Sequence, residues 1–337
     1  FFLKLFCYVG AISCMSLYFF SLDTVVLSLV SYLLALIGFW GSLVFYNSYL
    51  PDIAHKEQQD RISAKGFSLG YVGSVILLLI CLAMVMSVED NQKLQMMKYS
   101  FLLVGIWWIG FSQYSYYYLP NTKNTNKLHR NVVFNGFKEL RKVWHQLKEL
   151  KPLRRYLAAF FVYSMAVQTI MIIAAYFGEK EVQWGSDSKR TMGLIVSILL
   201  IQLIAVLGAW LTSKASTKFG NIKVLIFINF SWILICTYAY FVITPNDFYI
   251  AAAFVGLVMG GIQSLSRSTY SKFIPANTVD TTSFFSFYDV AEKIGIVIGM
   301  FTYGYIADVT GKIQNAILFL ILFFVVGLLL LLRVPKK

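Results

Sequence analysis

The sequence predicts an all-α, polytopic membrane protein, and three observations support this. Of its 337 residues, 58% are hydrophobic and only 13% are charged, whereas soluble domains carry roughly 25% charged residues. The hydrophobic residues gather in runs of about 20, which is the length that a helix needs to cross a bilayer. The loops between the runs alternate between strongly and weakly basic. Lipid, rather than water, is therefore expected to solvate most of the surface.

Ten of these runs are long enough to span a bilayer. Backbone groups in lipid need hydrogen-bond partners within their own segment, so each run is expected to be a helix. The alternating pattern of a transmembrane barrel strand does not occur. The predicted spans are residues 5–20, 25–49, 67–86, 99–119, 156–177, 191–212, 222–243, 248–265, 282–307 and 314–334.

The distribution of Lys and Arg predicts the orientation of these spans. Basic residues in short loops mark the cytoplasmic side. They are concentrated after the second, fourth, sixth and eighth spans and in the C-terminal tail, which places the C-terminus in the cytoplasm. These basic residues include Arg267 and Lys272 after the eighth span, Lys123, Lys127 and Arg130 after the fourth, and Lys336 and Lys337 in the tail.

A repeated sequence pattern predicts how the helices are organised. Residues 46–51 read Tyr-Asn-Ser-Tyr-Leu-Pro, and residues 270–275 read Tyr-Ser-Lys-Phe-Ile-Pro. Each copy precedes a polar loop and an aromatic-serine helix start, and six spans separate the copies, so both have the same orientation. Parallel repeats of six helices are the plan of major facilitator transporters. Ten helices of an expected twelve are then present, with two predicted before residue 1; chance similarity between apolar segments is the alternative.

This plan divides the chain into three parts. Residues 1–119 form an N-terminal bundle of four of the six helices, residues 120–152 form a cytoplasmic linker, and residues 153–337 form a C-terminal six-helix bundle. The linker is expected to contain an amphipathic helix on the inner leaflet, although a role as a partner-binding helix is also open. Its apolar stripe consists of Phe134, Phe137, Leu140, Trp144 and Leu147.

The ninth span carries ionisable residues well inside the membrane. Asp289, Glu292 and Lys293 share one face by their spacing of three and four residues. Such groups cost roughly 2.5–3.5 kcal/mol each on insertion scales, and they are candidates for function. We expect Glu292 or Asp289 to take up a proton or to bind a substrate ammonium group, with Lys293 holding the acid ionised or meeting a substrate carboxylate. A purely structural Asp289–Lys293 pair is the alternative.

Uncharged polar and small residues within the spans are a second set of candidates. Any of the polar side chains could bind substrate, and each could equally join neighbouring helices by a hydrogen bond. Glycines spaced four apart predict close helix packing. The polar candidates are Ser164, Gln168, Gln202 and Gln263, and the glycine pairs are Gly66 and Gly70, Gly256 and Gly260, and Gly295 and Gly299.

Several other classes of protein are disfavoured by the sequence. His55, His129 and His145, the only histidines, lie in predicted loops, and no hydrolase, metalloprotease or P-loop motif occurs, so an enzyme is not expected. The four cysteines are isolated in apolar runs, so no metal site, disulfide or cofactor is expected. The net charge of +13 resides in loops and does not indicate nucleic-acid binding. A receptor or scaffold would not require the six-plus-six repeat.

Four sequence runs resemble one known family. Residues 41–51, 60–67, 163–169 and 263–268 are similar to the vacuole-effluxer-like branch of the major facilitator superfamily, which contains the autophagy-related amino-acid efflux permeases of fungal vacuoles and many bacterial relatives. There are departures: Thr217 stands where an Asp is usual, and Met165-Ala166 stands where many relatives carry an acid.

The resemblance implies a secondary active transporter that works by alternating access in a bacterial cytoplasmic (inner) membrane. The expected activity is export or exchange of a small solute, with amino acids as the best candidate class and protons as the coupling ion. A different solute class, such as sugars or drugs, and a membrane receptor or scaffold are the alternatives. The expected partners are the lipid bilayer and a small-molecule substrate.

Overall fold

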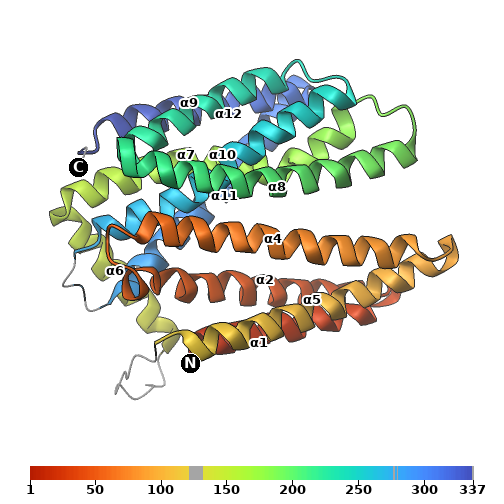
Figure 1. Ribbon diagram of the computed structural model, residues 1–337, viewed down its shortest axis with the longest axis horizontal. Coiled ribbons are helices and arrows are strands. Elements are labelled where there is room, and N and C mark those ends of the chain that lie inside the picture. The colour runs from red at the N-terminus through yellow and green to blue at the C-terminus, as the bar shows by residue number, and fades with distance from the viewer. Residues whose placement is uncertain (121–131, 276–277, 279, 336–337) are drawn as a thin grey trace. The chain divides into compact units, whose positions relative to one another are not determined.

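The structure is a computed structural model that describes residues 1–120, 132–275, 278 and 280–335. Long helices dominate it, and the described residues contain no strand (Figure 1). This confirms the predicted all-α membrane class. The loop residues Lys123, Lys127 and Arg130, His129, and the terminal Lys336 and Lys337 lie outside the described residues.

Nine helical segments in the described part of the chain are long and apolar enough to cross a membrane. The ninth predicted span, residues 282–307, is not among these nine and corresponds to helix α11 (Thr281–Thr310), which has 30 residues. Its length would cross a bilayer, but Asp289, Glu292 and Lys293 lower its hydropathy. The same residues that make α11 chemically interesting therefore also make its sequence less apolar.

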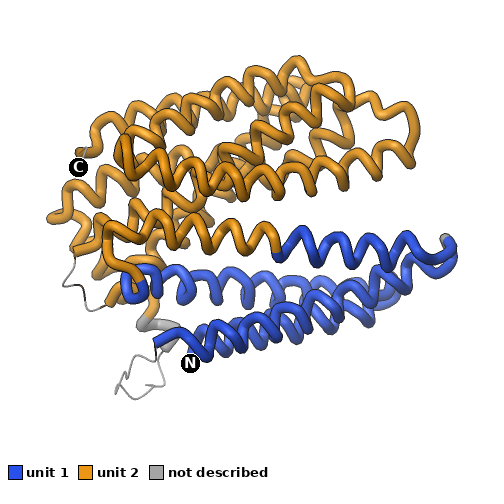
Figure 2. The backbone as a smooth tube through the Cα atoms, viewed as in Figure 1, with its two compact units in different colours: residues 1–53, 73–132 blue, residues 54–72, 133–337 orange. Residues whose placement is uncertain are grey.

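The chain divides into two compact units, shown in Figure 2. Unit 1 comprises residues 1–53 and 73–132. In it, α1 packs against both α2 and α5, and the Phe2 ring stacks on the Phe45 ring with centroids 5.7 Å apart. Its elements are α1 (Phe2–Ser16), η1 (Leu17–Phe19), η2 (Leu22–Thr24), α2 (Val25–Ser48), α3 (Leu50–Ile53) and α5 (Asp90–Tyr118).

Helix α4 (Gln59–Met86) belongs to both units. Residues 54–72, which include its first turns, cluster with unit 2, whereas its remainder clusters with unit 1 (Figure 2). One continuous helix therefore passes from one unit to the other. The predicted division at residues 119 and 153 follows chain order and stays a prediction.

Unit 2 contains residues 54–72 and 133–337. In its core, α7 lies against α11 and α12, and α9 lies against α10 and α12. The fully buried rings of Trp232 on α9 and Phe324 on α12 stack with centroids 5.6 Å apart. Besides α11 and the first turns of α4, the helices of this unit are α6 (Val132–Glu149), α7 (Lys151–Glu181), α8 (Asp187–Phe219), α9 (Asn221–Ala239), α10 (Pro245–Phe273) and α12 (Ile313–Leu332).

Local signals in the sequence fix where several of these helices begin and end. Thr244 and Asp247 form a reciprocal capping box at the start of α10, which satisfies two backbone N–H groups. Gly220 separates α8 from α9 at φ +85°, a conformation that side chains with a Cβ rarely adopt. The chain therefore reverses between α8 and α9 within one residue.

Helix α6 uses part of its predicted apolar stripe to contact the protein rather than lipid. Val143 and Leu147 are buried in the core of unit 2, whereas Phe137 and Trp144 are 71% and 58% exposed. The Trp144 ring also stacks on Phe287 of α11, 6.0 Å away. Leu147 thus belongs to the inner edge rather than to an outward stripe. The side chain of Phe134 lies outside the described part.

The glycine pair Gly256 and Gly260 lies where α10 crosses α8 closely, as predicted. A Cβ on Gly260 would collide with the backbone oxygen of Ala205, which a rotamer change cannot move. A Cβ on Gly299 would likewise meet Thr169 Oγ1 and the Met165 oxygen on α7. Gly70 differs, because nothing lies within 4 Å of its Cβ position. Small residues thus allow α8–α10 and α7–α11 contact, but Gly70 has no such role.

The same substitution should therefore have opposite effects at two glycines. We expect Gly260→Ala to lower stability by about 1–3 kcal/mol through overpacking. Gly70→Ala should raise stability by about 0.5–1 kcal/mol through helix propensity alone. Unfolding of both variants in one detergent measures the difference. Equal effects of the two substitutions would show that α8 and α10 do not meet at Gly260.

Candidate functional site

Helix α11 exposes one apolar face and packs its other face against the protein. Val297 and Phe301 are 68% and 75% exposed, whereas Asp289 is only 9% exposed. On the buried side, Gly295 allows α11 to approach Met165 of α7. The carboxylate of Asp289 therefore lies on the protein-facing side of a membrane helix, where a charge can find polar partners.

Glu292 is held by two donors. Gln168 of α7 donates from Nε2 to Glu292 Oε1 at 2.7 Å, and Lys293 donates from Nζ to Glu292 Oε2 at 2.6 Å. The side chain of Glu292 is 14% exposed and that of Lys293 is 31% exposed. The structure thus brings three predicted residues together into one cluster, in which the ion pair joins Lys293 to Glu292. A partly buried pair of this kind is sensitive to any change in charge.

The remaining predicted residues occupy neighbouring positions. Gln263 on α10 accepts a hydrogen bond from the Tyr71 hydroxyl of α4 and donates to Met171 Sδ at 3.5 Å. Met171 follows Gln168 by three residues on the same face of α7. The Gln263 amide therefore meets α7 one turn away from Gln168. Ser164 donates to the Phe161 oxygen of its own helix at 3.1 Å. Gln202 lies half-buried on α8, on a different helix from the Glu292 cluster.

A buried hydroxyl network accompanies this cluster, and the sequence analysis missed it. The hydroxyls of Tyr163 and Ser266 lie 2.7 Å apart, and Tyr156 donates to the Ser266 backbone oxygen at 2.9 Å. Both tyrosines are on α7 and almost fully buried, at 0–1% exposure. In an apolar sequence, the tyrosines were indistinguishable from core aromatics. Their only signal was that Tyr163 and Ser266 fall within the runs that resemble the family.

A second polar cluster ties the first turns of α4 to the rest of unit 2. The Asp60 carboxylate, 3% exposed, accepts from Lys272 Nζ at 2.5 Å. It also accepts from Asn221 Nδ2 at 2.9 Å and from Ser216 Oγ at 3.1 Å. These partners come from α10, from the start of α9 and from the end of α8. Asp60 therefore joins four helices through a single carboxylate, a geometry that compensates the cost of burying it.

Arg267 adds a second connection between α10 and α4. Its Nε donates to Ser63 Oγ at 3.1 Å, and its Nη2 donates to the Ser63 backbone oxygen at 3.3 Å. The guanidinium also lies over the Phe67 ring, 4.6 Å from the centroid. Arg267 is 6% exposed, so its charge is stabilised by hydrogen bonds and a cation–π contact.

This cluster corrects one step of the sequence analysis. Arg267 and Lys272 were assigned to a loop after the eighth span, but α10 continues to Phe273 and contains both. The prediction ended the span at Leu265 because charges follow it. Those charges remain within a helix because Asp60, Ser63 and Phe67 satisfy them.

The described residues contain no group of three or more acidic, His or Cys residues that could hold a metal ion.

We expect Asp60 and Lys272 to be energetically coupled. A double-mutant cycle with Asp60→Ala, Lys272→Ala and the combined variant should give a coupling of about 1–3 kcal/mol, because the pair is close and partly buried. Arg61→Ala, an exposed neighbour on the same helix, should change stability by less than about 0.5 kcal/mol. Thermal unfolding in detergent measures all four variants. A coupling near zero would mean that the contact does not hold α4.

Comparison with solved structures shows which fold these helices form. The E.coli fucose:proton symporter FucP aligns with a TM-score of 0.69 at 14% identity, over 99% of this chain and 82% of that one. The human organic anion transporter MFSD10 aligns with a TM-score of 0.68 at 12% identity, over 97% of this chain and 76% of that one. The chain therefore has the major facilitator fold.

The sequence comparison identifies the family. The chain belongs to the family described as vacuole effluxer Atg22 like, whose sequence profile matches residues 1–337. The MFS-type transporter YxiO of Bacillus subtilis (strain 168) is 29% identical over 97% of this chain and 76% of its own length. Autophagy-related protein 22 of Vanderwaltozyma polyspora is 28% identical over 81% of this chain and 55% of its own length.

These matches confirm the predicted family. The relatives and the solved structures are transporters rather than enzymes, as the sequence predicted. The chain spans about half the length of the fungal relatives it matches. The names of these fungal relatives specify neither a solute nor a coupling ion.

Proposed function

We propose that this protein is a secondary active transporter that moves a small solute by alternating access. The observation that carries the proposal is the Glu292 carboxylate, which is held between Gln168 of α7 and Lys293 of α11 within a membrane-spanning unit. A structural role alone would not require an acid here, because an apolar side chain would fill the same place at lower cost. The family membership supports the same activity.

In this proposal, Glu292 is the group that takes up a proton. Protonation neutralises the carboxylate and removes the ionic attraction that holds Lys293. The ammonium group of Lys293 is then available to meet an anionic group of the solute. Proton uptake and solute binding thus share one cation, which couples the two events in the sense of linked equilibria. Asp289, buried three residues earlier on the same face, is the second acidic group of the site.

Amino acids are the solute class that we propose. A zwitterion offers a carboxylate for Lys293 and an ammonium group for an acid, and both are present on α11. The amides of Gln168 and Gln263 add hydrogen-bonding groups on adjacent helices. The direction is proposed as export or exchange, in line with the effluxer description of the family.

Alternating access requires contacts that can break, and the α4 cluster supplies them. Asp60 and Ser63 attach the first turns of α4 to α8, α9 and α10 by side-chain hydrogen bonds. We assign these contacts to a latch that opens when the first turns of α4 separate from α8, α9 and α10. This end of α4 carries the basic loop that the sequence predicts to be cytoplasmic. The proposed location is a bacterial cytoplasmic membrane, with the C-terminus inside the cell.

We expect coupling of transport to a pH gradient to depend on Glu292. In proteoliposomes containing the full chain, Glu292→Gln should abolish the stimulation of amino-acid transport by an imposed pH gradient. It should leave solute exchange at equal pH within about threefold of the original rate, because the amide retains hydrogen bonds but cannot take up a proton. The measurement is radiolabelled amino-acid flux with and without the gradient.

Asp308→Asn is the matched control, because it removes an exposed acid from the other end of α11. It should leave the pH dependence unchanged. If Glu292→Gln retained full stimulation by the gradient, Glu292 would be excluded as the proton carrier. If neither the unaltered protein nor the Asp308→Asn control moved any amino acid, the proposed solute class would be wrong.

Lys293 should determine whether a carboxylate is required in the solute. We expect Lys293→Gln to lower the affinity for an amino acid by about tenfold or more, which corresponds to loss of a charge-assisted hydrogen bond. The affinity for the corresponding amino-acid amide, which lacks the carboxylate, should change by less than about threefold. Lys312→Gln, at an exposed position just beyond α11, is the control. Equal losses for both solutes would place Lys293 in a structural role.

A further inference from the structure

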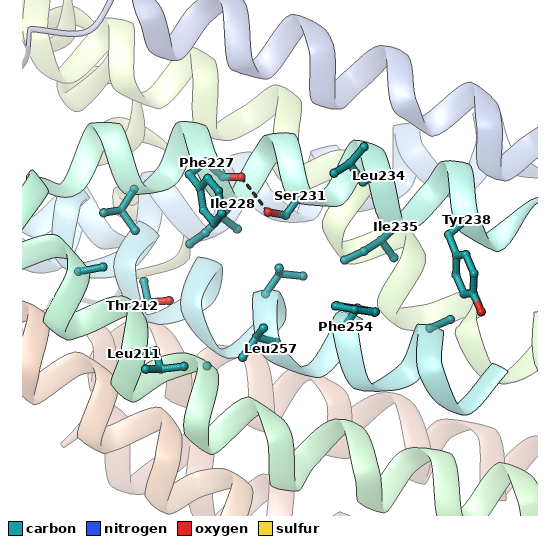
Figure 3. A pocket seen from close by; sticks show the side chains of 15 residues that line it. Leu211, Thr212, Phe227, Ile228, Ser231, Leu234, Ile235, Tyr238, Phe254 and Leu257 are labelled. Atoms are coloured by element: carbon teal, nitrogen blue, oxygen red, sulfur yellow. Dashed lines mark hydrogen bonds between the residues drawn. The ribbon is translucent and has the colours of Figure 1, made fainter. Parts of the chain in front are cut away.

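A deep apolar groove runs between α8, α9 and α10, and neither the transport site nor the latch uses it. Its volume is about 550 Å³, which is within the range of ligand pockets. Figure 3 shows Phe227 and Leu234 of α9, Phe254 of α10 and Leu211 of α8 around it. All three helices belong to unit 2.

The groove opens away from the protein and has a closed floor. Its rims are exposed, with Phe227 at 68% and Leu234 at 56%, whereas the floor residues Ile228 and Ile235 are 4% and 8% exposed. The Ser231 hydroxyl on its wall donates to the Phe227 oxygen of its own helix at 3.0 Å. Apart from Thr212, Ser231 and Tyr238, the lining is apolar, so hydrocarbon fits most of it.

The length of the groove suits an extended chain rather than a compact ligand. Its lining on α9 runs from Val224 to Tyr238, which is about 21 Å at 1.5 Å per residue. The hydrocarbon core of a bilayer is about 30 Å thick. Along a helix that crosses the bilayer, a groove of this length would extend over more than half of the hydrocarbon core.

One end of the groove is flanked by cations. Lys218 lies three residues beyond the lining residue Ala215 on α8, and Lys223 lies four residues before Phe227 on α9, so both continue the lining faces. Both lysines are exposed. Within the described part of the chain, neither forms a salt bridge, so both are available to an external anion.

We propose that this groove is a binding site for an anionic phospholipid. One acyl chain lies between α9 and α10, and the headgroup phosphate meets Lys218 and Lys223 near the turn at Gly220. Basic sites between membrane helices are suited to anionic headgroups, and the attraction is about fivefold in affinity for each cation near the surface. The inference does not depend on which solute is transported.

The test measures retained lipid on the purified full chain. Protein is exchanged into nanodiscs or mixed micelles containing equal amounts of phosphatidylglycerol and phosphatidylcholine, and bound lipid is counted by native mass spectrometry. We expect the unaltered protein to retain phosphatidylglycerol preferentially. The double variant Lys218→Gln, Lys223→Gln should lose about twentyfold of that preference. Lys180→Gln with Lys312→Gln removes the same charge from exposed loop-end positions and should retain it.

A second pair of variants tests the groove itself. Ser231→Phe should fill the groove and reduce retention of both lipids. Thr237→Phe is the matched control, because Thr237 also bonds to its own helix, at 2.9 Å, but does not line the groove. Equal retention of the two lipids by the unaltered protein, or a preference that survives loss of both lysines, would overturn the proposal. A changed oligomeric state of Ser231→Phe with unchanged lipid retention would instead identify a protein interface.

Discussion

The structure depends on one constraint: hydrocarbon provides no hydrogen bonds, so every polar group in it needs a partner inside the protein. For the backbone, this requires long helices, which the described residues form. For side chains, it requires that charges meet one another. Glu292 and Asp60 both satisfy this rule, since each carboxylate accepts hydrogen bonds from a lysine and from an amide on another helix.

These two acids nevertheless differ in what surrounds them. Asp60 accepts hydrogen bonds from three donors on three helices and is 3% exposed, so several partners hold its charge at once. Glu292 has two donors, one of which is its chain neighbour, and is more exposed at 14%. Asp60 therefore joins α4 to three other helices, whereas the contacts of Glu292 involve only α7 and α11.

Close helix approach has a comparable role among the uncharged residues. Gly260 lets α10 touch the backbone of α8, and Gly299 lets α11 touch α7. On α9, by contrast, the larger side chains of Phe227 and Leu234 are exposed at the rim of the groove. Tight seams and an open groove thus occur within one unit. In our proposal, a lipid chain occupies this groove.

The sequence by itself determined the helices, the family and the presence of ionisable residues within α11, because apolar length and charge within a span are local properties of the chain. It also joined Glu292, Lys293 and Gln168 as candidates, although not as bonded partners. Only the tertiary structure decided that Arg267 and Lys272 lie inside α10, that Leu147 faces inward, and that α9 borders a groove. Each of these depends on residues far apart in the chain, such as Asp60 and Lys272, whose proximity no local pattern encodes.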